Sequence, residues 1–347
     1  MAAFQFHRIR LRKRWSLVLV ITLLSVGGGW VYGYRLIQQA ADRLTTARRY
    51  TLGPEASQIM AQPELSGLKL TPFSVHTGDG LKLRALIAEP GTSSAAVAAL
   101  ESKRAELRRC FPALPDAPPG TCRGTVLMRH GINSREEHML WHARWLVAAG
   151  FRCAAWDSRG HGESDEASVT FGRREVNDAR RVLAAARGLL TEHADAPVYA
   201  YSHSMGAAIL LQWLASEPSI SAAVAVAPFA ELSAVMEKQA ADRAGGLLKA
   251  LVPLVRREVV TRAGFDPAEI SPLRTAGLIR CPVFFIHGER DSVIPPAQSA
   301  QLLAACTVPG SCRKVTTGAH GDALTAGGTQ LQAEVIEFFL EHSSRPQ

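Results

Sequence analysis

Ser204 occupies the position in this sequence that is best suited to nucleophilic chemistry. It lies between an apolar run at 197–200 and a helix-like run at 207–214, with the small residues Ser202 and Gly206 two positions to either side. A sharp turn from a strand into a helix needs small neighbours and exposes the serine hydroxyl at the positive end of the helix. The pattern therefore predicts that Ser204 is a nucleophile.

Two residues further along the chain have the types that such a serine needs. Asp291 follows a buried strand predicted at 282–286, and His320 follows a short strand predicted at 314–316. A histidine at this position can take the proton of Ser204 as a general base and return it to the leaving group. An aspartate can fix the tautomer of that histidine and stabilise its charged form. We therefore predict that Ser204, Asp291 and His320 form a catalytic triad.

The reaction of such a triad also needs donors for the oxyanion that develops on the attacked carbonyl. The backbone N–H of Met205 is one candidate, because it follows the nucleophile directly. A second donor is expected on the loop after the strand predicted at 124–129. We predict the N–H of Ile132, with Gly131 allowing the backbone to turn closely.

Strand and helix patterns surround these residues in an order that predicts their layout. Two strands at 68–75 and 81–88 flank the turn at 78–80, which is a strong hairpin signal. Residues 91–122 form an insertion, read either as a solvated decoration or as a gate for substrate. Strands and helices then alternate, which predicts a parallel sheet, until residues 229–276 break the pattern.

Four motifs together resemble those of the α/β-hydrolase superfamily. They are His130-Gly131, the loop 157–164, the turn around Ser204 and the stretch 287–291. More narrowly, the chain resembles membrane-anchored hydrolases related to Bem46-like proteins and the ABHD13/17-type enzymes. The resemblance covers roughly residues 70 to 343. It implies an α/β-hydrolase fold: a mostly parallel central sheet flanked by helices, with a small helical cap at 229–276.

The resemblance also bears on individual residues. It implies that Arg159 and His161 are structural, because the matching loop usually connects strand ends by hydrogen bonds. The sequence departs from the family at Ser202, which stands where the turn around the nucleophile commonly has glycine. Leucines in the cap either face the cleft, which would suit an acyl or lipid-like substrate, or pack the cap onto the sheet; they are Leu247, Leu248, Leu251 and Leu254.

The first 66 residues have the pattern of a membrane anchor. A basic tail at 1–14 precedes an uncharged run at 15–34 that is long enough to span a bilayer and is bracketed by Trp and Tyr. Residues 35–66 would be a juxtamembrane helix and linker, and 67–347 the hydrolase domain. Basic residues before the span favour a cytoplasmic N-terminus, and thus a catalytic domain on the periplasmic or extracytoplasmic side of the inner membrane. A cleaved signal peptide is the alternative.

The cysteines favour the same location. Cys110 and Cys122 bracket a Pro-rich loop, and Cys306 and Cys312 bracket a second short loop. Such loop-closing pairs are typical of disulfides in an oxidising compartment. The chain lacks Cys-x-x-Cys and His-rich spacings, so we expect neither a metal nor another cofactor.

Charge and composition narrow the function further. The net charge is +8 and the pI near 9.4, but much of the excess lies in the N-terminal tail and no nucleic-acid motif is present. We expect a monomeric serine hydrolase that cleaves small-molecule or lipid-like esters or thioesters through an acyl-enzyme. The alternatives are a peptidase or amidase of the same fold, and a membrane-tethered binding protein with a decayed site.

Overall fold

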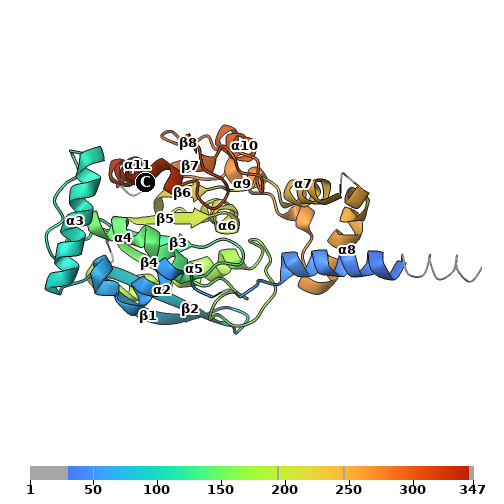
Figure 1. The fold of residues 1–347 in the computed structure, drawn as a ribbon, viewed down its shortest axis with the longest axis horizontal. Helices are drawn as coiled ribbons and strands as arrows, with labels where there is room; N and C mark the ends of the chain where they lie inside the picture. The colour runs from blue at the N-terminus through green and yellow to red at the C-terminus, as the bar shows by residue number, and fades with distance from the viewer. Residues whose placement is uncertain (1–29, 50, 194, 245–246, 344–347) are drawn as a thin grey trace, which may run out of the picture.

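The computed structural model describes residues 30–49, 51–193, 195–244 and 247–343. Its centre is an eight-stranded sheet in the order β1-β2-β4-β3-β5-β6-β7-β8 (Figure 1). The pairs β1–β2 and β2–β4 are antiparallel and the other pairs are parallel, so the predicted hairpin and the mostly parallel sheet are confirmed. The strands are β1 Leu68–His76, β2 Lys82–Pro90, β3 Thr125–Arg129, β4 Arg152–Trp156, β5 Val198–His203, β6 Ile220–Val226, β7 Val283–Gly288 and β8 Cys312–Thr316.

The burial of each strand follows from its place in the sheet. The inner strands β3, β4, β6 and β7 are buried at every position. Parallel strands covered on both faces need such continuous apolar runs. The edge strands β1 and β8 instead contain several exposed positions. The apolar core of the sheet therefore lies at its inner strands, and its exposed positions lie at the two edge strands.

Helices cover both faces of the sheet. Neighbouring residues of a strand point to opposite faces, so Met128 packs with one helical layer and Leu127 with the other. The first layer comprises α2 Pro54–Ala61, α3 Ser94–Cys110, α4 Leu140–Ala148 and α11 Gly328–Glu341. The second comprises α5 Glu175–Leu189, α6 Met205–Leu214, α9 Pro272–Ala276 and α10 Ala297–Ala305. Short 3₁₀ turns are η1 Pro63–Ser66, η2 Glu136–Met139, η3 Thr191–His193, η4 Leu247–Leu251, η5 Pro267–Glu269 and η6 Thr325–Gly327.

The insertion at 91–122 is built around α3. The Ser93 side chain caps this helix, and Leu100 and Leu107 enter the core of the first layer. Arg104 donates from Nε to the Ala148 carbonyl at 3.0 Å, which fixes α3 to α4. Helix α3 lies at the opposite end of the domain from α7 and α8 (Figure 1). The insertion is therefore a packed decoration that is remote from the cap.

The cap comprises α7 Leu232–Ala244 and α8 Val252–Ala263, and a further helix packs beside them. This N-terminal helix, residues 30–45, lies along α8 at one end of the molecule (Figure 1). Ala41 is fully buried and shares an apolar cluster with Met205, Phe229 and Val255. The segment expected as a juxtamembrane helix and linker is thus packed against the cap and the start of α6.

The predicted tail at 1–14 and residues 15–29 of the predicted span lie outside the described residues. Within the described ranges, none of the helices combines the length and the apolar character that crossing a bilayer requires. The membrane anchor stays a prediction.

The predicted disulfides are absent from the structure. Cys110, Cys122, Cys306 and Cys312 are all free thiols. The Cys122 Sγ lies 3.8 Å from the Gly124 carbonyl oxygen. The Cys306 thiol is buried with its Sγ 3.5 Å from the Ser311 hydroxyl, whereas Cys312 is exposed at the start of β8. Short separation in sequence did not bring the paired thiols into bonding geometry.

Candidate active site

Ser204 connects β5 to α6 through a strained backbone. Its φ is 54° and its ψ −122°, a region that residues with a side chain rarely adopt. The Ser204 N–H donates to the Val226 carbonyl at 2.8 Å, which ties the turn to β6. A Cβ atom at Gly206 would lie 2.5 Å from the His130 carbonyl oxygen, so only glycine fits there. The predicted sharp turn with a small residue after the serine is confirmed.

Ser204, His320 and Asp291 are hydrogen-bonded in series. The Ser204 Oγ lies 2.8 Å from His320 Nε2, and His320 Nδ1 lies 2.7 Å from Asp291 Oδ2. Asp291 follows β7 and His320 follows β8, so the parallel sheet delivers both loops to the same edge as the end of β5. The structure therefore brings together all three side chains that the sequence singled out.

Asp291 is held as a carboxylate by several donors. Its Oδ1 accepts from the N–H groups of Val293 and Ile294, at 2.9 and 2.8 Å. Burial raises the pKa of Asp291, but the hydrogen bonds from His287, His320 and Ile294 outweigh burial and hold it well below its usual range. The ionised carboxylate can therefore accept the Nδ1–H of His320 and leave Nε2 facing the serine.

His203 holds the loop that carries His320. Its Nε2–H donates to the His320 carbonyl at 2.9 Å, and the two rings lie 5.4 Å apart. Burial, followed by the neighbouring His320, lowers the pKa of His203 to about 4, so it is neutral at pH 7. The sequence predicts that His203 is a packing or supporting residue beside the nucleophile, whereas it does not predict the role of His287 beside Asp291.

The loop after β3 lies against the nucleophile. A Cβ atom at Gly131 would lie 3.1 Å from the Ser204 Cβ, so glycine permits this close approach. Ile132 and Met205, the predicted donors to the oxyanion, line the same cavity as Ser204. The next residue, Asn133, has a φ of 58° and accepts from the Arg48 N–H at 2.7 Å.

A buried histidine fixes the start of this loop. His130 accepts the Ser158 N–H at Nε2, 2.9 Å away, and donates from Nδ1 to the Gly131 carbonyl at 2.7 Å. Burial, followed by the nearby His161, lowers the pKa of His130 to about 3. His130 is therefore a neutral hydrogen-bonding link between the loops that follow β3 and β4.

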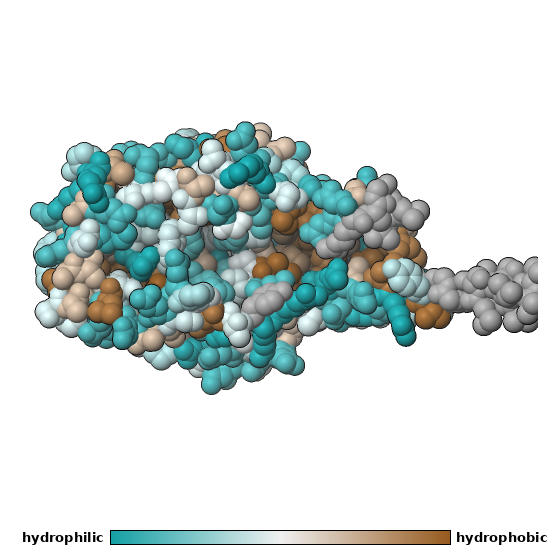
Figure 2. All heavy atoms as spheres, viewed as in Figure 1, coloured by the Kyte–Doolittle hydropathy of each residue, from teal (hydrophilic) through white to brown (hydrophobic). Residues whose placement is uncertain are grey.

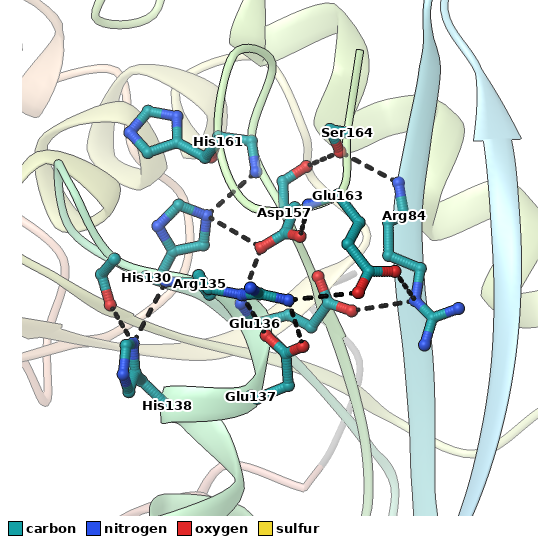
Figure 3. Close-up of polar contacts among 12 residues, drawn as sticks. Arg84, His130, Arg135, Glu136, Glu137, His138, Asp157, His161, Glu163 and Ser164 are labelled. Atoms are coloured by element: carbon teal, nitrogen blue, oxygen red, sulfur yellow. Dashed lines mark hydrogen bonds and ion pairs between the residues drawn. The ribbon is translucent and has the colours of Figure 1, made fainter. Parts of the chain in front are cut away.

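Asp157 is the centre of a sealed polar cluster (Figure 3). Its two carboxylate oxygens accept from the N–H groups of Glu136 and Glu163, at 2.9 and 2.7 Å. Its carbonyl accepts from the Ser164 hydroxyl, which in turn accepts from the Arg84 N–H. Burial, followed by the proximity of Asp157, raises the pKa of Glu136 to about 10, so Glu136 keeps its proton at neutral pH.

The same cluster contains three carboxyl groups close enough to bind a metal ion. Ligand atoms of Glu136, Glu137 and Asp157 lie within 4.8 Å of one another. Arg84 Nε lies 3.2 Å from Glu136, however, and Arg135 Nη2 lies 2.7 Å from Glu137. These contacts occupy Glu136 and Glu137, and Asp157 already accepts two backbone N–H groups, so we assign the cluster a structural role. Sequence spacing did not reveal it, because Asp157 follows β4 whereas Glu136 and Glu137 follow β3.

The two catalytic-looking residues of the loop 157–164 are also engaged in structure. Arg159 pairs with Asp79 and Asp178, each at 2.8 Å, and thereby joins the β1–β2 turn to α5. His161 donates from Nδ1 to the Arg159 carbonyl at 2.9 Å. Neither side chain lines the cavity that contains Ser204. The structural interpretation of this loop is confirmed.

A cavity of about 910 Å³ opens above Ser204 and His320. Leu251 lines it, as one of the two expectations for the cap leucines had it. Leu254 is 47% exposed and does not line the cavity, so neither facing the cleft nor packing the cap onto the sheet describes it. The side chains of Leu247 and Leu248 lie outside the described part of the cap. Other apolar residues supply the wall: Leu232, Val235 and Met236 of α7, and Val252 and Val255 of α8.

The N-terminal helix supplies a wall that the sequence analysis missed. Leu36, Ala40 and Leu44 line the cavity, as do Arg43 and Arg48. Their spacing of four residues was a visible signal for one helical face, but its partner, the cap, is some 200 residues away in sequence. Figure 2 shows hydrophobic residues gathered toward the end where this helix and the cap lie.

Comparison with known proteins places this geometry in context. Residues 120–272 match the family described as serine aminopeptidase, S33. The chain is 25% identical over 232 residues to the uncharacterized protein YqkD of Bacillus subtilis, covering 63% of this chain and 72% of YqkD.

Solved structures give the same result for the fold. The esterase Pf2001 of Pyrococcus furiosus superposes with a TM-score of 0.63 at 20% identity, over 87% of this chain and 99% of the esterase. The acylaminoacyl peptidase of Pyrococcus horikoshii superposes with a TM-score of 0.56 at 14% identity, over 83% of this chain but only 44% of the peptidase. The protein therefore has the α/β-hydrolase fold.

Proposed function

We propose that the protein is a serine hydrolase that cleaves carboxylic ester or thioester bonds through an acyl-enzyme. The observation that carries this proposal is the hydrogen-bonded series from Ser204 to His320 to Asp291 at the base of a large cavity. A strained nucleophile, a base and an orienting carboxylate in contact are the parts of a serine hydrolase. A decayed site would not need to keep all three in register.

The proposed reaction follows from these contacts. The Ser204 Oγ attacks the substrate carbonyl carbon while His320 Nε2 takes the serine proton. The bond from the carbonyl carbon to the leaving oxygen or sulfur then breaks, and His320 gives the proton to that atom. Water repeats the sequence on the acyl-enzyme and releases a carboxylic acid. Asp291 stays ionised throughout and stabilises the imidazolium of His320.

The oxyanion would be stabilised by the N–H groups of Met205 and Ile132. Both residues line the cavity beside Ser204, and the glycine at 131 lets the Ile132 loop approach it. Donors fixed in advance at this position lower the barrier because they need no reorganisation when charge develops.

A fluorophosphonate probe tests the proposal directly. We expect the full chain, purified in detergent, to gain the mass of one adduct, and Ser204→Ala to gain none. The same variant should lose several orders of magnitude in kcat, because the nucleophile anchors the mechanism. Turnover of Ser204→Ala near the wild-type rate would exclude Ser204 as the nucleophile.

A peptidase or amidase activity is the second candidate, and the match of residues 120–272 to the serine aminopeptidase S33 family favours it. Ester and amide hydrolysis use the same triad and differ in the leaving group. Matched aminoacyl esters and aminoacyl p-nitroanilides separate the two. Comparable kcat/KM values on both would favour the peptidase, and cleavage of esters alone would favour the esterase.

We further propose that residues 15–34 anchor the protein in the inner membrane, with the catalytic domain on the extracytoplasmic side. The support is the uncharged sequence of this run and the exposure of Trp30, Tyr32 and Tyr34, which suit an interface. Alkaline carbonate should leave the full chain in the membrane, and external protease should digest the domain in spheroplasts. Release by carbonate would contradict the anchor.

A further inference from the structure

Two separate segments supply apolar walls to the cavity above Ser204. One is the cap, with Val235, Met236 and Val255, and the other is the N-terminal helix, with Leu36 and Ala40. The volume of about 910 Å³ lies at the upper end of the range for small-molecule sites, about 300–1,000 Å³. The cavity is therefore large enough for a long apolar group beside the reacting carbonyl.

The N-terminal helix is fixed relative to the nucleophile rather than loosely attached. Ala41 is fully buried, and the Thr45 carbonyl accepts from the Val169 N–H at 2.8 Å. Beyond the helix, the Arg48 N–H donates to Asn133 Oδ1 at 2.7 Å, and Arg49 Nη2 donates to the Ser164 carbonyl at 2.9 Å. These contacts hold residues 36–48 at a set distance from the loop that carries Ile132.

The polar part of the same cavity carries a positive charge. Arg43 and Arg48 both line it and are exposed, and neither forms an ion pair within the described residues. Glu55 is the single acidic residue among those that line it. Burial lowers the pKa values of His138, His142 and His203, so these lining histidines are neutral at pH 7. The charged residues that line the cavity, apart from its histidines, are thus two arginines and one glutamate.

We propose that the substrate is an acyl ester or thioester whose leaving group is anionic. The acyl chain lies between the N-terminal helix and the cap, and Arg43 and Arg48 bind the anion. A guanidinium presents paired donors that match carboxylate, phosphate and sulfonate oxygens, and it keeps its charge at any physiological pH. This inference rests on the proposed hydrolase function and adds the substrate class and the residues that select it.

Matched thioesters provide the test. Acyl chains of four to sixteen carbons are joined either to 2-mercaptoethanesulfonate, which is anionic, or to 2-mercaptoethanol, which is neutral, and the released thiol is measured. We expect the full chain to prefer the anionic series by three- to tenfold in kcat/KM, the range of one or two exposed ion pairs. In the Arg43→Gln/Arg48→Gln double variant, kcat/KM on the anionic series should fall to the value for the neutral series.

Two control variants separate a specific site from a general effect. Arg35 is exposed on the same helix but does not line the cavity, so Arg35→Gln should leave the preference unchanged. Ala40→Trp should reduce kcat/KM for the longest chains by at least tenfold and spare the four-carbon substrate. Val31→Trp, an exposed site outside the cavity, should leave the chain-length profile unaltered.

The outcomes distinguish this inference from the function on which it rests. Loss of fluorophosphonate labelling at Ser204 would overturn the proposed hydrolase. Normal labelling and cleavage of four-carbon thioesters, with equal rates on the two series, would overturn the anionic leaving group and leave the hydrolase in place. A chain-length profile that Ala40→Trp does not change would overturn the position of the acyl chain.

Discussion

Two clusters in this protein combine an aspartate with a histidine, and only one of them faces a cavity. In the first, Asp291 lies 2.7 Å from His320, which contacts Ser204. In the second, Asp157 lies 3.9 Å from His130, and both side chains are fully buried. Both ring nitrogens of His130 are hydrogen-bonded to backbone groups, whereas the Nε2 of His320 is hydrogen-bonded to the Ser204 hydroxyl at the cavity. The residue types are therefore the same in both clusters. What differs is whether the histidine reaches the cavity and has a ring nitrogen that no backbone group occupies.

The second cluster nevertheless serves the first. His130 and Asp157 tie the loop after β3 to the loop after β4, and the loop after β3 continues into Gly131 and Ile132. A fixed oxyanion donor needs a fixed loop, since preorganisation is the source of its effect. The cluster around Asp157 thus provides rigidity, and the cluster around Ser204 carries the proposed chemistry.

We expect the largest effect on activity for Asp291→Asn. An amide there cannot hold the Nδ1–H tautomer of His320, so kcat/KM should fall by roughly four orders of magnitude, as such a change does in serine proteases. The fold should persist, because the amide oxygen can still accept from Val293 and Ile294. Steady-state kinetics and circular dichroism measure the two properties. A loss of less than tenfold would show that Asp291 does not orient the base.

Asp157→Asn should have the opposite profile. One of the two oxygens that accept from Glu136 and Glu163 becomes an NH₂ group facing a backbone N–H. Leaving such buried donors unpaired should cost about 3 kcal/mol in the free energy of unfolding, measured with urea. The folded fraction should keep activity within about tenfold. A folded variant as inactive as Asp291→Asn would remove the distinction between the clusters.

Glu136→Gln should have the smallest effect on activity, and its effect on stability should depend on pH. The pKa of Glu136 is raised to about 10 in the folded protein from an ordinary value near 4.5. Between these values the folded state binds a proton that the unfolded state has lost, so the stability of the wild type falls as pH rises. The glutamine variant lacks this loss. Its free energy of unfolding should therefore rise relative to that of the wild type by at most about 1.4 kcal/mol per pH unit. Parallel stability curves from pH 6 to 9 would show that Glu136 is ionised.

The triad could be predicted from sequence because the fold makes its geometry a matter of topology. The strands before Ser204, Asp291 and His320 belong to one run of parallel strands, so the loops that follow them meet at the same end of the sheet. The small residue Gly206 added a local steric signature that the structure explains through the His130 carbonyl. The local pattern around Ser204 and the order of the strands therefore both predicted where Ser204, Asp291 and His320 lie.

The features that were not predicted correctly have a different origin. The spacing of Cys306 and Cys312 says nothing about where their Cβ atoms point, and one thiol is buried while the other is exposed. The cap face is likewise set by tertiary packing, which turns Leu254 to solvent and Val255 into the apolar cluster. The partner of residues 36–44 lies about 200 positions away, beyond the reach of periodicity.

The wall that the N-terminal helix contributes also has a consequence for how the shape of the cavity can be changed. Leu36, Ala40 and Leu44 are encoded before β1, upstream of every strand of the sheet. Substitutions at these positions would change the shape of the cavity without changing any strand of the sheet. A change of residue at these positions should therefore alter which molecules fit the cavity and leave the contacts among Ser204, His320 and Asp291 in place.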